Sequence, residues 1–441
     1  MRTLSKPNPD MLKSLEVDHA AVEKYPITLV TPMFGGGAKA GEVDGETPIR
    51  ASAIRGQLRF WWRATRGAKF DTTYELRKRE TEIFGDTERP SPVKVWVSGE
   101  KVNLKRRMSF PKYALYSAGD EMEKAKKQAE YTVGYTFELH IEYKDASLKS
   151  EIEAALWAWI NFGGIGSRTR RGCGSLYCPD FSPQKAEVVA NRFPNWFDRK
   201  VKDYDLKLLP AGESREWPTL SNRFKVRSQQ GQVKQNWDEA IEAYRVFRRR
   251  ANDGKQPNRP GRSHWPEADS IRTITRMKHP KHHKRYPHNK PANLIAFPRA
   301  EFGLPIIFEF KQKFDEDKNI PIAELRKRQW FEKEPYKTQL LPAGKDRLAS
   351  PVILKPLAYG RQDAIGLIIL LNQPPLKKLE LQRVGRTDKW SYGEKEIHPK
   401  IHYDNNPMVD RNGTLRNSAI EAFLNSEEVE RFCQSTNLNK R

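Results

Sequence analysis

Apolar residues in the first 180 positions follow two periods, which predict a mixed series of strands and helices. Period-two alternation predicts strands in YPITLVTPMF (25–34), SPVKVWVSG (91–99) and YTFELHIEY (135–143). Helical spacing predicts helices in 52–67, 72–85 and 151–162, and SLYC (175–178) follows as a short strand. With 72–85 as an addition, this is the β-α-β-β-α-β order of a ferredoxin-like domain.

The second half carries similar but less regular signals. They predict a strand in 217–229, a helix in 236–250, apolar strands in 302–310, 347–360 and 363–372, and a final helix in 417–433. We therefore predict an α+β chain of two tandem ferredoxin-like domains. Its parts are an N-terminal extension (1–24), a first domain (25–185), a linker (186–215) and a decorated second domain (216–441) with a basic, histidine-rich insertion at about 251–292.

A glycine- and arginine-rich loop, GGIGSRTRRGCG (163–174), joins the apolar helix 151–162 to the strand SLYC. Glycines let a backbone approach a ligand and leave its N–H groups uncovered, and guanidinium groups clamp phosphate oxygens. The alternative is a sharp turn after the helix, for which one or two glycines would suffice. Five glycines within a basic run favour contact with a polyanion.

The helix at 52–67 has a second basic stripe, formed by Arg55, Arg59, Arg63 and Arg66. Ser52 can cap its start. Trp61 and Trp62 are adjacent, so we expect one of them in the core and the other free to stack beside arginine on an unpaired base. The alternative is a solvated charged face, but arginines without interleaved acids gain no support from neighbouring turns.

The formal net charge of +23 and pI near 9.7 favour an acidic partner, RNA or DNA first. A membrane surface is the competitor, yet no apolar run reaches spanning length and no basic amphipathic helix stands at a terminus. Three cysteines suit a reducing compartment, and the polar start lacks the core of a signal peptide. We therefore expect a cytoplasmic protein.

The sequence gives only weak signals for a metal site or for catalytic residues. His279, His282, His283 and His288 lack diagnostic spacing, so a solvated basic loop is favoured over a metal site. The acids of the 38–48 loop (Glu42, Asp44 and Glu46) could meet a bound strand, but nothing near them in sequence shifts a pKa or positions a metal. We expect no cofactor, no metal and no catalytic residue.

The motifs together resemble the RAMP superfamily, whose members carry a glycine-rich loop like GGIGSRTRRGCG. More narrowly, the chain resembles the first RAMP subunit of type III-B (Cmr) CRISPR effector complexes. The stretches that carry this resemblance are TPMFGGG, IRGQLRFWWR, EIFGD, GRSHWPEADSIR, FGLPIIF and RLASPVIL. It implies tandem ferredoxin-like domains, no enzymatic activity, other RAMP subunits as partners and a role in antiviral interference. It also implies a place near the 3′ end of the guide RNA, where the subunit helps to capture target RNA.

The resemblance also implies an RNA surface. The family lines this surface with first-helix arginines and the glycine loop, which here are Arg55, Arg59, Arg63, Arg168, Arg170 and Arg171. We add the motif neighbours Ser52, Gly56, Trp62, Gly163, Gly164, Ile165, Gly166, Ser167, Thr169 and Gly172. Two alternatives stay open: a RAMP-type endoribonuclease using Asp44 or a histidine of the second half, and a free-standing RNA-binding protein.

Overall fold

The computed structural model describes residues 22–434 except 38, 40, 100–106, 117–121, 190, 211, 228, 230, 252–262, 278–292 and 311–333. The chain divides into two compact units. The first comprises 1–222, 230–237 and 355–366, and the second comprises 223–229, 238–354 and 367–441. The architecture is α+β, as predicted. Most of the predicted N-terminal extension lies outside the described residues, and residues 22–24 begin the first strand.

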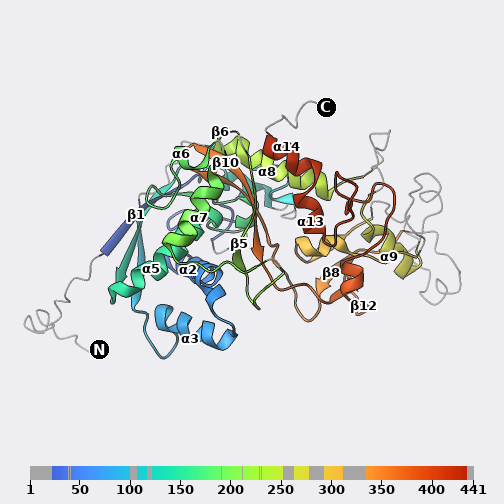
Figure 1. Ribbon diagram of the computed structural model, residues 1–441, viewed down its shortest axis with the longest axis horizontal. Coiled ribbons are helices and arrows are strands. Elements are labelled where there is room, and N and C mark those ends of the chain that lie inside the picture. Colours follow the sequence, from blue (N-terminus) through green and yellow to red (C-terminus); the bar gives the residue numbers. More distant parts are fainter. Residues whose placement is uncertain are drawn as a thin grey trace, which may run out of the picture. The chain divides into compact units, whose positions relative to one another are not determined.

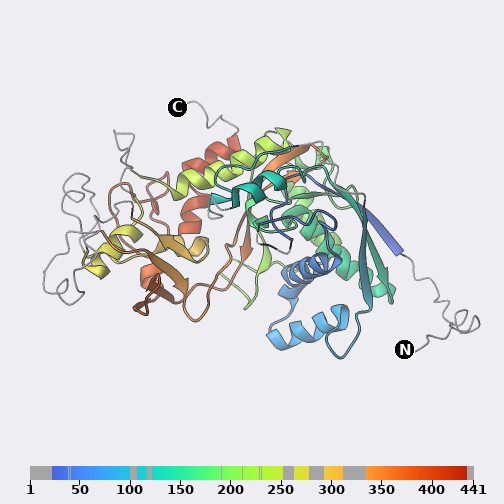
Figure 2. The same ribbon diagram turned by 180° about the vertical axis from the view of Figure 1, so that it is seen from behind.

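The first unit is built on an antiparallel sheet of order β2-β3-β1-β4. Its strands are β1 (Val22–Leu29), β2 (Val93–Gly99), β3 (Thr136–Tyr143) and β4 (Leu176–Tyr177). Helices α2 (Ala51–Thr65) and α5 (Lys149–Phe162) lie side by side on one face of the sheet (Figures 1 and 2). The element order predicted for the first half is therefore confirmed, with α3 (Thr73–Phe84) and α4 (Glu123–Ala129) as additions.

The periodicity explains the core of this unit. In β3 the alternate residues Phe137, Leu139 and Ile141 are buried against the helices. Helix α5 is apolar on nearly all sides and is buried accordingly. The expectation that only one of Trp61 and Trp62 is core is wrong, because α2 is covered on two sides and both rings are buried.

The segment 186–215 is not the linker that we predicted. It contains α7 (Phe193–Asp203), which follows the short helix α6 (Lys185–Val188). The α7 side chains of Trp196 and Phe197 are buried and lie about 6 Å from the Trp157 ring of α5. The segment is thus part of the first unit's core.

The second unit contains an antiparallel sheet of order β12-β11-β8-β7. Its strands are β7 (Ile306–Phe308), β8 (Thr338–Pro342), β11 (Leu379–Arg383) and β12 (Lys389–Tyr392). Leu340 and Leu381 of this sheet share a buried cluster with Phe297. The sequence analysis predicted only β7, because the other strands are only four or five residues long, which is too short for a period-two pattern to stand out.

A further sheet has the order β5-β10-β6, with β9 paired to β10. Its strands are β5 (Thr219–Val226), β6 (Gly231–Gln232), β9 (Val352–Ala358) and β10 (Asp363–Asn372). Helices in this half of the chain include α8 (Val233–Arg248), α9 (Glu267–Thr275), α13 (Ala419–Leu424) and α14 (Glu427–Gln434). The division between the units runs through β5, α8, β9 and β10.

Two predictions for the second half need correction. The segment 251–292 was expected to lack packed structure, but its described part forms α9 and buries Trp265 completely. Its histidines at 279, 282, 283 and 288 lie outside the described residues. The predicted final helix is two helices, because α13 ends at Leu424 and α14 starts at Glu427. No helix in the described ranges is long and apolar enough to cross a membrane.

Candidate nucleic-acid interface

The base of the glycine loop is interior structure rather than ligand surface. Gly163 follows the end of α5, and a Cβ there would lie 2.5 Å from Trp61 Nε1 and 2.6 Å from Trp159 O. A Cβ at Gly164 would lie 2.8 Å from Gly174 O. Only glycine fits such approaches. The predicted contact residues Gly163, Gly164, Ile165 and Gly172 are buried, so we remove them from the interface.

The tip of the loop is what solvent reaches. We define it as residues 166–171: Ser167 and Arg168 are exposed, and Gly166, Thr169, Arg170 and Arg171 are half-buried. Arg168 adopts a left-handed conformation (φ 62°), and Thr169–Arg171 form a 3-10 turn behind it. The chain therefore reverses direction at the tip, where Ser167 and Arg168 are the exposed side chains.

Two guanidinium groups of the tip lie over aromatic rings. Arg170 Cζ is 5.9 Å from the centre of the Phe60 ring of α2, and Arg171 Cζ is 5.6 Å from the Tyr113 ring. Burial lowers the pKa of Arg170 to about 10, so this side chain still carries its charge at neutral pH. The Phe60 contact joins the glycine loop to the first helix, as the predicted RNA surface requires.

Internal bonds hold several amides of the loop. Ser167 N donates to Phe34 O at 2.6 Å, and Gly172 N donates to Thr169 O at 2.9 Å. Arg171 N and Cys173 N both donate to Arg168 O. Amides used in this way cannot bind a phosphate, so our expectation of uncovered backbone N–H groups is wrong at these four positions. The tip would act mainly through its side chains.

The arginine stripe of α2 faces α3. Arg59 Nε donates to Glu80 Oε1 at 2.7 Å, and Arg63 donates to the same oxygen. Arg55 donates to the carbonyl of Phe84. The Glu80 side chain is 8% exposed, whereas Arg59 and Arg63 are 41% and 32% exposed. One carboxylate thus holds two guanidinium groups, which leaves a surplus of positive charge at the surface.

The remaining first-helix residues do not support the predicted interface equally. Ser52 is not a cap, because α2 starts at Ala51 with Arg50 at its N-cap. Ser52 and Gly56 are exposed, and a Cβ at Gly56 would meet nothing within 4 Å. Trp62 is fully buried, and its Nε1 donates to Glu151 at 2.8 Å. Its ring cannot stack on a base, so we remove it from the interface.

Asp44 has a local structural role. Its Oδ1 accepts hydrogen bonds from the amides of Glu46 and Thr47 at 3.0 Å, and its Oδ2 accepts one from Arg50 at 3.0 Å. The Thr47 amide, followed by Arg50, lowers the pKa of Asp44 to about 2. Such a carboxylate is ionised at neutral pH and too weakly basic for efficient proton transfer. Among the described residues, no three His, Cys, Asp or Glu side chains are grouped to hold a metal.

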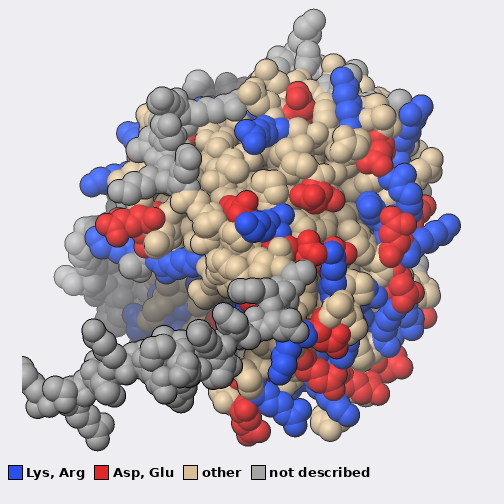
Figure 3. Space-filling view, turned by 90° about the vertical axis from the view of Figure 1, so that its left-hand side faces the viewer, with Lys and Arg blue, Asp and Glu red and all other residues tan. Residues whose placement is uncertain are grey.

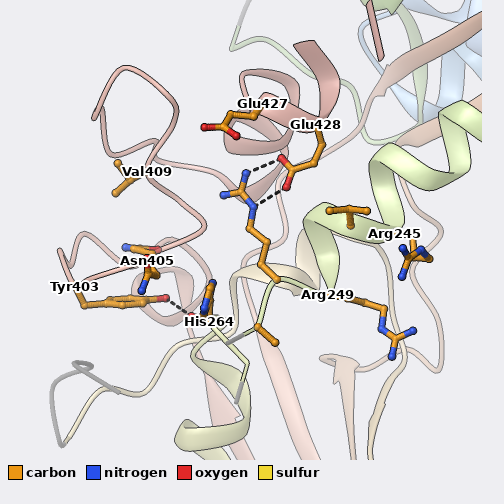
Figure 4. Close-up of a pocket in the computed structure, with 12 residues that line it drawn as sticks. Arg245, Arg249, His264, Tyr403, Asn405, Val409, Glu427 and Glu428 are labelled. Atoms are coloured by element: carbon orange, nitrogen blue, oxygen red, sulfur yellow. Dashed lines mark hydrogen bonds and ion pairs between the residues drawn. The ribbon is translucent and has the colours of Figure 1, made fainter. Parts of the chain in front are cut away.

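Two other surfaces carry acidic as well as basic side chains. Acidic side chains lie among the basic ones across the view in Figure 3. The second unit has a pocket of about 620 Å³, which Figure 4 shows lined by arginines, glutamates, His264 and Tyr403. Arg250 pairs with Glu428 through two bonds of 2.8 and 2.6 Å, and Arg245 pairs with Glu242. These pairs offset the charge of the pocket, so the glycine-loop tip is the better site for a polyanion.

Sequence reasoning missed three residues that contact the loop. Tyr113 lies under Arg171, Trp237 donates from α8 to Arg171 O, and Lys355 donates from β9 to Gly163 O. Phe60, the fourth contact, belongs to the FWWR motif that the sequence analysis had singled out. Tyr113, Trp237 and Lys355 belong to segments far from the loop along the chain, and no local sequence pattern connects them with it.

Comparison with known proteins supplies a family. A model described as the RAMP superfamily matches residues 26–177. The CRISPR system Cmr subunit Cmr1-2 of Pyrococcus furiosus is 32% identical over 177 residues, covering 34% of this chain and 92% of that protein. Subunit Cmr1-1 of the same organism is 30% identical over 134 residues, covering 29% of this chain and 40% of that protein.

Solved structures of low identity also match. The apo crystal structure of Cmr1 from Pyrococcus furiosus matches with a TM-score of 0.43 at 16% identity, covering 86% of this chain and 96% of that chain. A chain in the cryo-EM structure of the Type III-B Cmr-beta bound to cognate target RNA has a TM-score of 0.42 at 11% identity. That match covers 80% of this chain and 95% of the other.

Proposed function

Because the chain belongs to the Cmr1 family of the RAMP superfamily, we propose that it is a non-catalytic RNA-binding subunit of a type III-B CRISPR effector complex. Its partners are the guide RNA, the target RNA and other RAMP subunits of the complex. It acts near the 3′ end of the guide RNA and helps to capture target RNA in the cytoplasm. The fold proposed with this function is two tandem ferredoxin-like domains, which the series β5, α8, β9 and β10 supports for the second half.

The tip of the glycine loop carries the proposal. Three arginines stand within four residues there, and two of them lie over Phe60 and Tyr113. An aromatic ring beneath a guanidinium limits its motion, so less entropy is lost when it grips a phosphate. Each charge-assisted contact contributes about 1.5 to 3 kcal/mol when desolvated and less when exposed. Contacts of this kind favour salt-dependent binding with little sequence preference.

A salt titration of RNA binding tests this function. We would measure the affinity of the reconstituted complex for single-stranded target RNA with R168A, R170A and R171A in turn. Each variant should weaken binding and reduce the salt slope by about one. R170K should restore affinity only partly, because lysine lacks the bidentate fork. R431A is the matched control, since Arg431 is an exposed arginine of the second unit that pairs with Glu427. Equal losses from R431A and the tip variants would overturn the proposal.

The two alternatives have tests of their own. Purified protein incubated with guide precursor and target RNA should leave both intact. Mutation-sensitive products would instead establish a ribonuclease. Copurification from native cells should recover other RAMP subunits together with guide RNA. A chain that always purifies alone is a free-standing RNA-binding protein.

A further inference from the structure

Several carbonyl oxygens of the glycine loop accept hydrogen bonds from buried side-chain donors. Trp159 Nε1 donates to Gly164 O at 2.9 Å, and Thr31 Oγ1 donates to Gly172 O at 2.7 Å. A carbonyl left outward at this site would repel a phosphate, because both carry negative charge. Carbonyls bonded to buried donors therefore keep the outer side of the loop suitable for a polyanion.

Two further donors to carbonyls of the glycine loop come from the second half of the chain. Lys355 of β9 is fully buried, and its Nζ donates to Gly163 O at 2.8 Å and Ile160 O at 3.2 Å. Trp237 of α8 is fully buried, and its Nε1 donates to Arg171 O at 2.7 Å. Both residues lie in segments that belong to the first unit, 355–366 and 230–237.

The Lys355 contact sits where α5 ends and the loop begins. The last carbonyls of a helix have no partners within the helix, and its C-terminus carries partial negative charge. A buried lysine is costly to desolvate, so it persists only where its donors are well used. The cost of placing Lys355 here is offset by the two carbonyls that fix the exit of the chain from α5.

We propose that Lys355 and Trp237 are positioning residues of the glycine loop, which hold its base and its tip in the geometry that binds RNA. Lys355 acts at the base, through Gly163. Trp237 acts at the tip, through the carbonyl of Arg171. The part of this inference that concerns RNA rests on the proposed function, whereas the part that concerns loop geometry does not. The RNA-binding surface of the first unit is then incomplete without two residues encoded in the second half.

Hydrogen exchange combined with RNA binding tests the inference in the full-length chain. K355M keeps the apolar stem of lysine but removes the donor, and W237F keeps a ring but removes the indole N–H. W157F is the matched control: Trp157 is equally buried, and its Nε1 has no partner among the described residues. We would measure amide exchange across 163–174 and affinity for single-stranded RNA for each variant.

We expect about tenfold faster exchange across 163–174 in K355M and W237F than in W157F, because each leaves a buried carbonyl unpaired. RNA affinity should fall about three- to tenfold in the same two variants. Loop exchange equal to that of W157F would overturn the positioning role. Faster exchange with unchanged RNA affinity would uphold the positioning role and overturn the glycine loop as the RNA site. Should K355M not fold, W237F gives the same decision at the tip.

Discussion

Arg59 Nε donates to Glu80 Oε1 across 2.7 Å, so a nearly buried carboxylate of α3 orients a guanidinium of the proposed RNA surface. Arg63 shares the same oxygen. Two half-exposed cations on one acid leave a net positive charge, and their positions are fixed before RNA arrives. The pairing therefore gives the stripe two functions, since it joins α2 to α3 and prepares a cationic surface.

This arrangement predicts opposite effects of E80Q on stability and on binding. Glutamine keeps the shape of Glu80 but removes the charge, so the protein should lose about 1 to 2 kcal/mol of unfolding free energy. RNA binding should tighten, with a salt slope steeper by about one, because one acid no longer neutralises the arginines. Urea unfolding and RNA titration over salt measure the two effects.

E82Q is the control for this prediction. Glu82 lies on the same helix and pairs with Arg79, and both side chains are more than a third exposed. It should change stability by less than about 0.5 kcal/mol. If E82Q tightened RNA binding as much as E80Q, the effect would reflect overall charge, and the stripe would have no special place in binding.

Two variants of Arg168 separate the effect of its charge on RNA binding from the effect of its left-handed backbone on stability. A non-glycine residue in the left-handed region costs about 1 kcal/mol relative to glycine, so R168G should be slightly more stable than the wild type and than R168A. Both variants should bind RNA more weakly, with a salt slope reduced by about one. Thermal unfolding and RNA affinity, measured together, test the pair.

Asn191 provides the comparison for R168G. It also has a left-handed backbone, with φ 63°, and it is exposed outside the loop. N191G should raise stability by a smaller amount, because asparagine tolerates this conformation, and should leave RNA affinity unchanged. If R168G bound RNA with wild-type affinity, Arg168 would not be part of the RNA interface.

The order of strands and helices in the first half could be predicted because the spacing of apolar residues determines it. Alternation assigns each residue of β3 to a face, and an all-apolar α5 has to be buried. The same reasoning identified the arginines of α2 but not their partner Glu80, since an ion pair between two helices leaves no trace in either pattern alone. Helix α7 was missed for a related reason, as its aromatic residues lie in a segment broken by proline and charge.

The glycine loop shows where composition misleads. Five glycines suggested ligand contact throughout, yet Gly163 and Gly164 are required by Trp159 and Gly174, which approach from inside. Only the tip remains as candidate surface. Whether another part of the protein approaches a glycine closely depends on how distant segments pack. Neither the number of glycines nor their spacing distinguishes such packing from contact with a ligand.

The geometry of Asp44 predicts that it has no part in RNA cleavage. With a pKa near 2, the group is ionised throughout the neutral range, so it has no proton to donate. The full-length protein and D44A should both leave labelled target RNA intact in the presence of Mg²⁺. Gel electrophoresis after prolonged incubation is the measurement. Fragments that appear with the wild type and disappear with D44A would establish Asp44 as a catalytic group.

Lys355 predicts a pH dependence of stability. Burial lowers the pKa of its ammonium from 10.5 to about 7, so the folded chain releases this proton at lower pH than the unfolded chain does. Between those values the unfolded state binds more protons, and the free energy of unfolding rises with pH by up to about 1.4 kcal/mol per unit. K355M lacks this contribution. The difference between wild type and K355M should therefore grow from about pH 7 upward.

Urea unfolding of both proteins from about pH 6 to about pH 9 measures the difference. K389M is the control, because Lys389 is half-exposed and pairs with Glu380, and its difference from wild type should stay nearly constant. A constant difference for K355M as well would mean that Lys355 stays protonated, held by the end of α5 as a permanent cation.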